Sequence, residues 1–247
     1  MLLVDLGNSR IKWGQLVNGE LQQVSSAVWR TDLVACLDEH WSALSPDTIA
    51  LLSVADAATT GQLINWCTQH WQQTPQQYYS TAAAAGVTNA YANPAQLGAD
   101  RWAGMIAAYN IYHGPVCVVD AGTAVTLDVV DAQGQHSGGL ILPGAAALWQ
   151  SVRGTTARVL TDADEKLLPP PDTVLGATTQ QCAAAGIWHA IAGGVERAVQ
   201  QLPSQTRNYI LTGGSAPVLA KLLDAQWRQV PDLVLRGLAI LANKQQR

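Results

Sequence analysis

A short acidic glycine turn occurs twice in this chain. Its two copies are Asp5-Leu6-Gly7-Asn8-Ser9 and Asp120-Ala121-Gly122-Thr123-Ala124, and each follows an apolar run typical of a buried strand. Glycine lets backbone amides approach a phosphate closely. The aspartate offers a hard oxygen ligand for Mg²⁺, and the Ser or Thr hydroxyl can bond a phosphate oxygen. One such turn is most often only a loop, but two after matching strands predict a pair that handles a nucleotide.

The sequence after each turn repeats as well. Asn18-Gly19 and Gln133-Gly134 lie at equal offsets from Asp5 and Asp120, and both have the composition of tight hairpin turns. A repeated order of strand, acidic turn, strand, hairpin turn and strand indicates a duplicated domain. We therefore expect the two copies to face one shared cleft.

Length and composition fit two globular domains. A chain of 247 residues is long enough for two domains of about 100–120 residues each, and we expect them at residues 1–113 and 114–247. Hydrophobic residues make up 48% and charged residues 13%, which is typical of a compact protein. A net charge of −4 without a run of Lys or Arg argues against a nucleic-acid partner. Arg10, Lys12 and Arg101 are the candidate positive groups for a nucleotide.

Several features predict a cytoplasmic protein without a membrane partner. The first strand starts at the second residue, which leaves no room for a cleavable signal peptide. No apolar stretch approaches the ~20 residues that span a membrane. The four cysteines are widely spaced and read as free thiols in a reducing compartment. The five histidines show no zinc-ligand spacing.

Strand meanders followed by helix–strand alternation predict an α/β architecture with mixed sheets. In the first half we expect three strands up to residue 29, a helix capped by Thr31, a strand at 48–54, a helix around 63–71, a strand near 77–79, a loop over 81–96 and a helix from Gly98 to about Tyr112. In the second half we expect three strands over 115–142, helices around 145–159 and 179–200, a strand at 209–211 and two final helices.

Asp100 is the candidate proton acceptor. Phosphoryl transfer needs phosphate positioning, a cation and often an acceptor for the hydroxyl proton. Asp100 follows Gly98-Ala99 in the first turn of an expected helix, where the helix dipole favours a carboxylate. The alternative is a helix-capping aspartate paired with Arg101. Arg101 has a planar fork suited to a carboxylate or phosphate, and its plain alternative is a surface ion pair.

Another double glycine follows a late strand. Thr212-Gly213-Gly214-Ser215 separates the expected strand at 209–211 from a helix. Backbone without side chains can lie flat against a base or ribose, and a helix N-terminus favours phosphate. Such turns end many strands, but this one follows two phosphate-type turns.

Five motifs in this order resemble those of the type III pantothenate kinases, a family of the acetate and sugar kinase, Hsc70 and actin superfamily. They are Asp5-Leu6-Gly7-Asn8-Ser9, Gly98-Ala99-Asp100-Arg101, Asp120-Ala121-Gly122-Thr123, Gly138-Gly139-Leu140-Ile141-Leu142-Pro143-Gly144 and Thr212-Gly213-Gly214. The resemblance covers nearly the whole chain. It implies duplicated ribonuclease H-like (actin-like ATPase) domains around an ATP cleft, and ATP-dependent phosphorylation of pantothenate to 4′-phosphopantothenate, the first step toward coenzyme A.

The resemblance also implies roles for individual residues. Asp100 matches the proton acceptor, and Asp120 matches a ligand of a monovalent cation (K⁺ or NH₄⁺). The implied ATP contacts are Asp5, Leu6, Gly7, Asn8, Ser9, Arg10, Ile11, Lys12, Thr123, Gly213 and Gly214, with Mg²⁺ reached by Asp5 through a phosphate. The implied pantothenate contacts are Tyr91, Gly98, Ala99, Asp100, Arg101 and Thr179. The family further implies a homodimer.

Three departures from the family pattern are visible. Thr178-Thr179 stands where the family commonly has Asn-Thr, Cys182-Ala183 replaces a frequent Ala-Ile pair, and Ser9 replaces a frequent Thr. The last change keeps the hydroxyl. Two other functions stay open: a kinase of the same superfamily that acts on a sugar or another small hydroxylated acceptor, and a non-catalytic accessory factor that regulates gene expression. The retained Asp5, Asp100 and Asp120 count against the second.

Overall fold

The computed structural model describes residues 1–29, 32–155, 167, 169–170, 174–202, 206, 208–223 and 226–245. The chain divides into two compact units. Unit 1 comprises Met1–His113, Ala132–His136 and Asp232–Arg247, and unit 2 comprises Gly114–Asp131 and Ser137–Pro231. One division falls between His113 and Gly114. The last helix and residues 132–136, which we expected in the C-terminal domain, lie in unit 1.

A mixed five-stranded sheet forms the centre of unit 1. Its strands lie in the order β3-β2-β1-β4-β5. Their bounds are β1 Leu2–Leu6, β2 Arg10–Val17, β3 Glu20–Val28, β4 Ile49–Ser53 and β5 Gln76–Tyr78. Strand β1 pairs antiparallel with β2 and parallel with β4, and β4 pairs parallel with β5. The meander and the parallel crossover agree with the sequence prediction.

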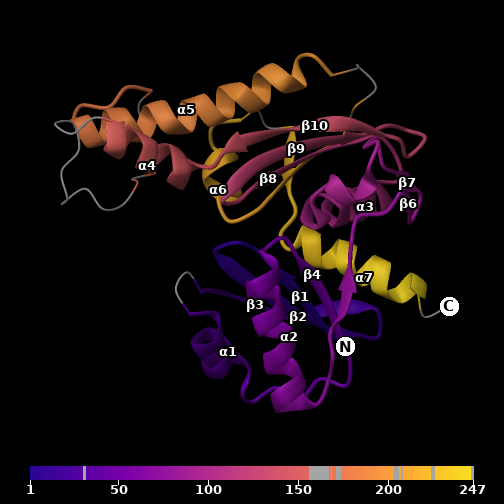
Figure 1. The fold of residues 1–247 in the computed structure, drawn as a ribbon. Helices are drawn as coiled ribbons and strands as arrows, with labels where there is room; N and C mark the ends of the chain where they lie inside the picture. Colours follow the sequence, from indigo (N-terminus) through magenta and orange to yellow (C-terminus); the bar gives the residue numbers. More distant parts are fainter. Residues whose placement is uncertain are drawn as a thin grey trace. The chain divides into compact units, whose positions relative to one another are not determined.

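Helices cover both faces of this sheet because β1 is apolar on both sides. Leu2, Val4 and Leu6 pack in the core with helices α1 (Leu33–Trp41) and α2 (Ala57–Trp71). Leu3 packs in a second core with α3 (Ala99–Tyr112) and α7 (Leu233–Gln245). Figure 1 shows α1 and α2 on one side of the sheet and α7 on the other. Successive strand residues point to opposite faces, so Asp5 lies on the same face as Leu3, toward α3 and α7.

The loop expected over residues 81–96 contains short elements that the sequence did not reveal. Strands β6 (Ala83–Ala84) and β7 (Val87–Thr88) form a small antiparallel hairpin. A 3₁₀ helix, η1, spans Pro94–Gln96. Two-residue strands are too short to produce an alternating pattern, so a prediction from periodicity misses them.

Unit 2 repeats the sheet of unit 1. Its strands lie in the order β10-β9-β8-β11-β12, with bounds β8 Val116–Ala121, β9 Ala124–Val130, β10 His136–Pro143, β11 Asn208–Thr212 and β12 Trp227–Gln229. Strand β8 is antiparallel to β9 and parallel to β11, and β11 is parallel to β12. The two sheets therefore share their strand order and the directions of these three strand pairs, which confirms the predicted duplication of an α/β fold.

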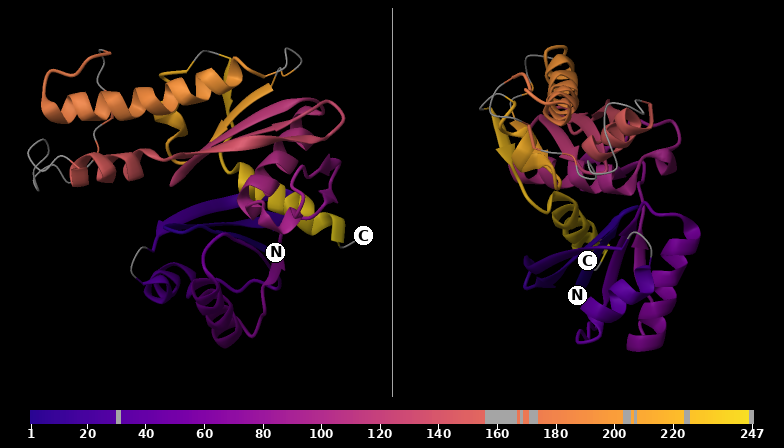
Figure 2. Two further views of the ribbon diagram at one scale, coloured as in Figure 1. Left: turned by 45° about the horizontal axis from the view of Figure 1, so that its top comes forward. Right: turned by 90° about the vertical axis from the view of Figure 1, so that its left-hand side faces the viewer.

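Helices α4 (Ala145–Thr155) and α5 (Thr179–Val199) lie side by side (Figure 2). Trp149 of α4 and Ile187 and Ile191 of α5 pack in one core with Val119 of β8. A short helix, α6, spans Ala216–Leu219. The sequence missed β12, because its three residues are polar or half-exposed and pair with only one neighbouring strand.

Two expectations fall on residues outside the described ranges. Thr31, the expected cap of the first helix, is one of them; in the structure Asp32 caps α1, and its Oδ1 accepts from the Ala35 amide at 2.9 Å. Residues 156–159, the expected end of the helix that begins at Ala145, are the other. The helix expected from Gly98 to about Tyr112 is confirmed as α3.

Candidate active site

The first acidic turn begins at the end of β1. Asp5 is in register with Lys12 of β2, and opposite residues of an antiparallel pair share one face of the sheet. The Lys12 ammonium donates to Asp232 Oδ1 at 3.0 Å, next to the start of α7. The turn therefore places a carboxylate beside a lysine on the face that carries α3 and α7.

Backbone contacts hold this turn in place. The Gly7 amide donates to the Arg10 carbonyl at 3.0 Å. Trp29 donates from its indole to the Gly7 carbonyl and from its amide to the Ser9 carbonyl, both at 3.2 Å. The Arg10 guanidinium donates to Ser26 Oγ at 3.1 Å.

Not every residue of the predicted ATP-binding stretch can offer a side chain. Leu6 and Ile11 are fully buried in the core of unit 1, so only their backbone can reach a ligand. Asn8 and Arg10 are exposed, and Asp5, Gly7, Ser9 and Lys12 are half-buried.

Asp100 lies in the first turn of α3. The N-cap residue is Gly98, which has no side chain to cap the helix, so Asp100 is not the capping residue of the alternative interpretation. Its Oδ1 accepts from the Arg101 amide at 2.7 Å. A Cβ on Gly98 would lie 2.7 Å from that oxygen, so the carboxylate occupies the space that glycine leaves. The helix dipole stabilises its ionised form.

Arg101 is buried with an aromatic partner. It is 9% exposed, so its side chain does not lie on the surface. Its Nη1 donates to the Tyr91 hydroxyl at 3.0 Å, and the guanidinium lies 5.9 Å from the centre of the Tyr91 ring. The structure thus brings together Asp100, Arg101 and Tyr91, three of the predicted substrate contacts. Ala99 is buried, and its neighbour Gly98 accepts from Ser80 Oγ at 3.4 Å.

The second acidic turn has different neighbours. Asp120 is in register with Thr126 of β9 and with Thr212 of β11, whereas Asp5 is in register with a lysine. The two duplicated aspartates therefore lie in different electrostatic surroundings: a basic residue faces the first and hydroxyl side chains face the second.

Two glycines from distant motifs pack against the second turn. Gly213 has φ +92°, and a Cβ there would overlap Asp120 Oδ1 and lie 2.6 Å from the Ala121 carbonyl carbon and oxygen. A Cβ on Gly144 would overlap the Thr123 carbonyl oxygen and lie 2.8 Å from that of Gly122. The structure thus joins three predicted motifs around Asp120, and it leaves Thr123 and Gly214 exposed.

The surroundings of Asp120 offer oxygen atoms of the kind that a hard cation takes as ligands. A carboxylate beside backbone carbonyls is an oxygen donor set, and the close glycine contact leaves the carboxylate pressed against backbone. Within the described residues no group of three or more His, Cys, Asp or Glu could hold a metal ion. A divalent ion that is bound together with a nucleotide can take oxygen ligands from phosphate and water as well as from a carboxylate.

The two neighbouring threonines of α5 have separate roles. Thr178 is the N-cap residue, and its hydroxyl accepts from the Gln181 amide at 3.2 Å. Thr179 is the first helical residue and is exposed. Capping uses an acceptor lone pair of the Thr178 hydroxyl, whereas Thr179 has no part in the cap.

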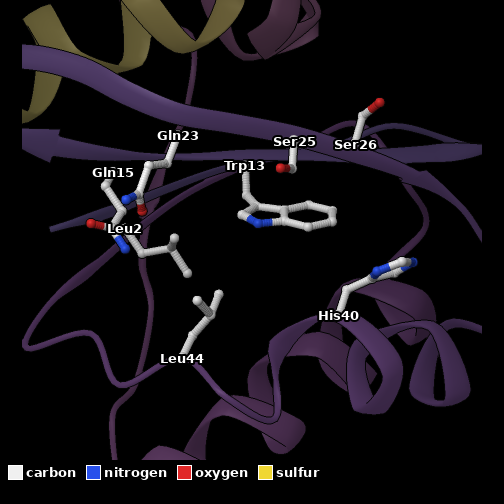
Figure 3. Close-up of a pocket in the computed structure, with 8 residues that line it drawn as sticks. All are labelled: Leu2, Trp13, Gln15, Gln23, Ser25, Ser26, His40 and Leu44. Atoms are coloured by element: carbon white, nitrogen blue, oxygen red, sulfur yellow. The ribbon is translucent and has the colours of Figure 1, made fainter.

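A cavity of about 440 Å³ lies in unit 1, apart from the predicted site residues. Its lining includes Trp13, Gln15, Gln23 and His40, which Figure 3 shows between the sheet and the first helix. The described residues that line it include no lysine or arginine. Sequence reasoning missed Asp232 as the partner of Lys12 and His136 as a neighbour of Tyr91, and no motif marks either residue.

Among the described residues, no helix has the length and apolarity to cross a membrane.

The two repeated sheets define a protein with the actin-like ATPase fold. Solved structures agree: the activator of 2-hydroxyisocaproyl-CoA dehydratase from Clostridium difficile, bound to ADPNP, matches with a TM-score of 0.55 and 12% identity over 100% of this chain and 96% of that one. The archaeal actin homologue Ta0583 matches with a TM-score of 0.51 and 12% identity over 99% and 100%. At these identities the likeness shows the fold alone.

The chain belongs to the type III pantothenate kinase family. The family model of that description matches residues 1–201. A type III pantothenate kinase of Nitrosococcus oceani is 34% identical over 98% of this chain and 93% of its own length, and one of Aromatoleum aromaticum is 35% identical over 99% and 98%. The resemblance seen in the five motifs is thereby confirmed.

Proposed function

We propose that this chain phosphorylates pantothenate at the expense of ATP, with Asp100 as proton acceptor. The pantothenate hydroxyl oxygen forms a bond to the γ-phosphorus, and the bond from that phosphorus to the β–γ bridging oxygen breaks. The hydroxyl proton passes to the Asp100 carboxylate, and the products are 4′-phosphopantothenate and ADP. Family membership carries the activity, and the position of Asp100 in the first turn of α3 carries its role.

The Arg101–Tyr91 pair supports a site for the pantothenate carboxylate. A buried guanidinium is a strong partner for a carboxylate, because its fork matches both oxygens and the low local dielectric strengthens the pair. The Tyr91 hydroxyl fixes Nη1 of that fork. Gly98 and Ala99 would contact pantothenate through their backbone, and Thr179 through its exposed hydroxyl.

ATP would be held by residues 5–12 together with Thr123, Gly213 and Gly214. The open backbone of Gly7 and the polar side chains of Asn8, Ser9, Arg10 and Lys12 suit phosphates. Mg²⁺, when bound with ATP, offsets charge on the triphosphate. Asp5 would approach it through a phosphate or water. Because the transition state is loose, positioning and neutralisation contribute more than early deprotonation.

Asp120 is our candidate ligand for a monovalent cation, K⁺ or NH₄⁺. Its register neighbours are threonines, and the Gly213 backbone presses against its carboxylate. A cation there would supply positive charge near the nucleotide site. An assay with K⁺ replaced by Na⁺ tests this: activity that is equal in both salts contradicts the assignment.

We further infer a homodimer. Leu140 and Ile141, on the edge strand β10, are 45% and 65% exposed, and adjacent exposed apolar residues on an edge strand are a surface that association would cover. Sedimentation equilibrium at several concentrations tests this inference, and a monomer throughout would overturn it.

Because ATP is the phosphoryl donor, we expect the enzyme in the cytoplasm, which cell fractionation would test.

The central experiment compares Asp100→Asn with Asp56→Asn. Asp56 is also an acidic residue at a helix N-terminus, where it caps α2, and asparagine caps equally well. We expect Asp100→Asn to bind ATP but to lose roughly 100-fold or more in turnover of pantothenate, while Asp56→Asn keeps wild-type turnover. Near-normal turnover of a folded Asp100→Asn protein would exclude the base assignment.

The same assay separates the alternative functions. Wild-type protein that prefers a sugar to pantothenate would point to another kinase of the superfamily. No phosphorylation of any acceptor, together with direct binding to DNA or to a regulator, would support the accessory factor.

A further inference from the structure

The duplicated hairpin turns differ in their surroundings. Gly19 and Gly134 hold equivalent positions and have nearly equal φ angles of +82° and +80°. A Cβ on Gly19 would meet nothing within 4 Å. A Cβ on Gly134 would overlap the Gly86 carbonyl oxygen and lie 3.3 Å from Tyr109 Cζ. Only the second turn is therefore packed against other backbone.

The tip of the second hairpin, residues 132–136, is bound to the segment that leads to Tyr91. The Thr88 amide of β7 donates to the Gly134 carbonyl at 2.8 Å, and Thr88 forms a parallel bridge with Gln135. The Tyr109 hydroxyl of α3 donates to the Ala132 carbonyl at 3.4 Å. All these residues belong to unit 1.

His136 connects the hairpin tip to the Tyr91–Arg101 pair. It is 4% exposed, and its ring stacks on that of Tyr91 with centroids 6.1 Å apart and an interplanar angle of 15°. The Tyr91 side chain also accepts a hydrogen bond from Arg101 and makes a cation–π contact with it, and the Tyr91 amide donates to Asn89 Oδ1 at 2.9 Å. The histidine therefore supports the ring that orients the guanidinium.

We propose that residues 132–136 are a positioning element for the acceptor site, with His136 as the positioning residue of Tyr91. This inference rests on the proposed function in one respect, the binding of pantothenate by Tyr91 and Arg101. Tyr91 lies in a segment whose strands β6 and β7 have two residues each. The hairpin tip binds this segment through the Thr88 amide and packs against the Tyr91 ring through His136.

Kinetic constants of His136 variants test the stacking. Loss of the ring in His136→Ala removes the stacking partner of Tyr91, and small displacements of binding groups have large kinetic costs. We expect the KM for pantothenate to rise on the order of tenfold, with the KM for ATP unchanged. His136→Phe keeps a flat ring and should restore most of the pantothenate affinity. A wild-type KM in His136→Ala, or no rescue by His136→Phe, would overturn the role.

The matched pair Gly134→Ala and Gly19→Ala tests the docking. Both changes introduce the same left-handed strain, but only the first drives a methyl group into the Gly86 backbone. We expect Gly134→Ala to raise the KM for pantothenate and Gly19→Ala to leave it at the wild-type value. Equal constants in both variants would contradict the positioning element.

Hydrogen exchange measures the contact between residues 132–136 and the segment that contains Tyr91, and it needs no acceptor substrate. Amides in residues 83–91 should exchange faster in Gly134→Ala than in Gly19→Ala, because the first variant loosens the contact through Thr88. If wild-type protein fails to phosphorylate pantothenate, the proposed function fails while this comparison still decides the inference. Equal exchange of residues 83–91 in both variants would refute it.

Discussion

The Asp120 carboxylate lies so close to Gly213 that no side chain fits between them. A Cβ on Gly213 would overlap Asp120 Oδ1, and the φ of +92° at Gly213 disfavours any other residue. The Ser215 amide also donates to the Ala121 carbonyl at 2.8 Å. The late double glycine and the second acidic turn are thus one structure, and the position of the carboxylate depends on the absence of a side chain at Gly213.

We predict that Gly213→Ala damages the nucleotide site. The methyl group must displace the Asp120 carboxylate or the Ala121 carbonyl, and both lie where we propose that ATP and the cation bind. The KM for ATP should rise by roughly tenfold or more, and any stimulation by K⁺ should fall. Steady-state kinetics and calorimetric ATP binding measure both effects.

Gly138→Ala is the control for backbone strain. Gly138 also belongs to unit 2 and has φ +105°, but a Cβ there meets nothing within 4 Å. This variant should lose some stability and keep the wild-type KM for ATP. If both variants weaken ATP binding equally, strain and not the clash with Asp120 explains the effect.

Lys12 and Asp232 allow a test of the first turn. Their side chains are 27% and 25% exposed and 3.0 Å apart. Lys12→Met removes an ammonium proposed to meet phosphate, so the KM for ATP should rise several-fold. Asp232→Asn leaves the Lys12 ammonium in place, and asparagine tolerates the left-handed φ of +59° at this position. The KM for ATP of this variant should therefore be unchanged.

The free energy of unfolding separates the contribution of this ion pair to stability from the role of Lys12 in ATP binding. A double-mutant cycle of the two changes should give a coupling free energy of about 0.5–1 kcal/mol, as expected for a partly exposed pair. An equal rise of the ATP KM in Asp232→Asn would show that the pair acts as one unit, which contradicts a separate phosphate role for Lys12.

Two glycines at the contact of α3 with α7 predict opposite effects on stability. A Cβ on Gly237 would overlap the Ala103 carbonyl oxygen, whereas one on Gly104 would meet only Leu233 Cδ2 at 4.0 Å. Gly237→Ala should force the helices apart and destabilise by about 1–3 kcal/mol. Gly104→Ala should stabilise by roughly 0.5–1 kcal/mol, because alanine is the better helix former. Urea unfolding measures the change in the free energy of unfolding for each variant. Changes of the same sign in both variants would refute the close crossing of α3 and α7.

The sequence predicted the local parts of this protein well. Helix α3 was expected from Gly98 to about Tyr112, because a glycine and an acidic first turn mark its start, and the structure has it there. The duplication was visible because both copies keep an Asp-x-Gly turn and a hairpin turn at equal offsets. Those signals are short-range, and each is set by backbone angles or strand alternation.

The sequence could not predict the long-range contacts. Lys12 pairs with Asp232 from the far end of the chain, and no pattern near either residue indicates it. Asn18-Gly19 and Gln133-Gly134 look alike as turns, but only the second meets Gly86 and Thr88. The roles of the site residues remain predictions that the variants above will test.

Thiol reactivity provides a last prediction, with its pH dependence. Burial raises the pKa of both Cys67 and Cys117 to about 12, and the charge of Asp128 adds to the effect at Cys117. Only the thiolate reacts with iodoacetamide, and a group with such a pKa is roughly one part in 10⁴ thiolate at pH 8. Cys182 is exposed. Native protein at pH 8 should therefore be alkylated at Cys182 first, while Cys67 and Cys117 react only after addition of urea. Because both buried thiols remain almost fully protonated at pH 9, raising the pH from 8 to 9 should still leave Cys67 and Cys117 unalkylated in the native protein. Peptide mass spectrometry locates the adducts, with Cys182→Ser as the control, and rapid native labelling of Cys117 would contradict its burial in the core of unit 2.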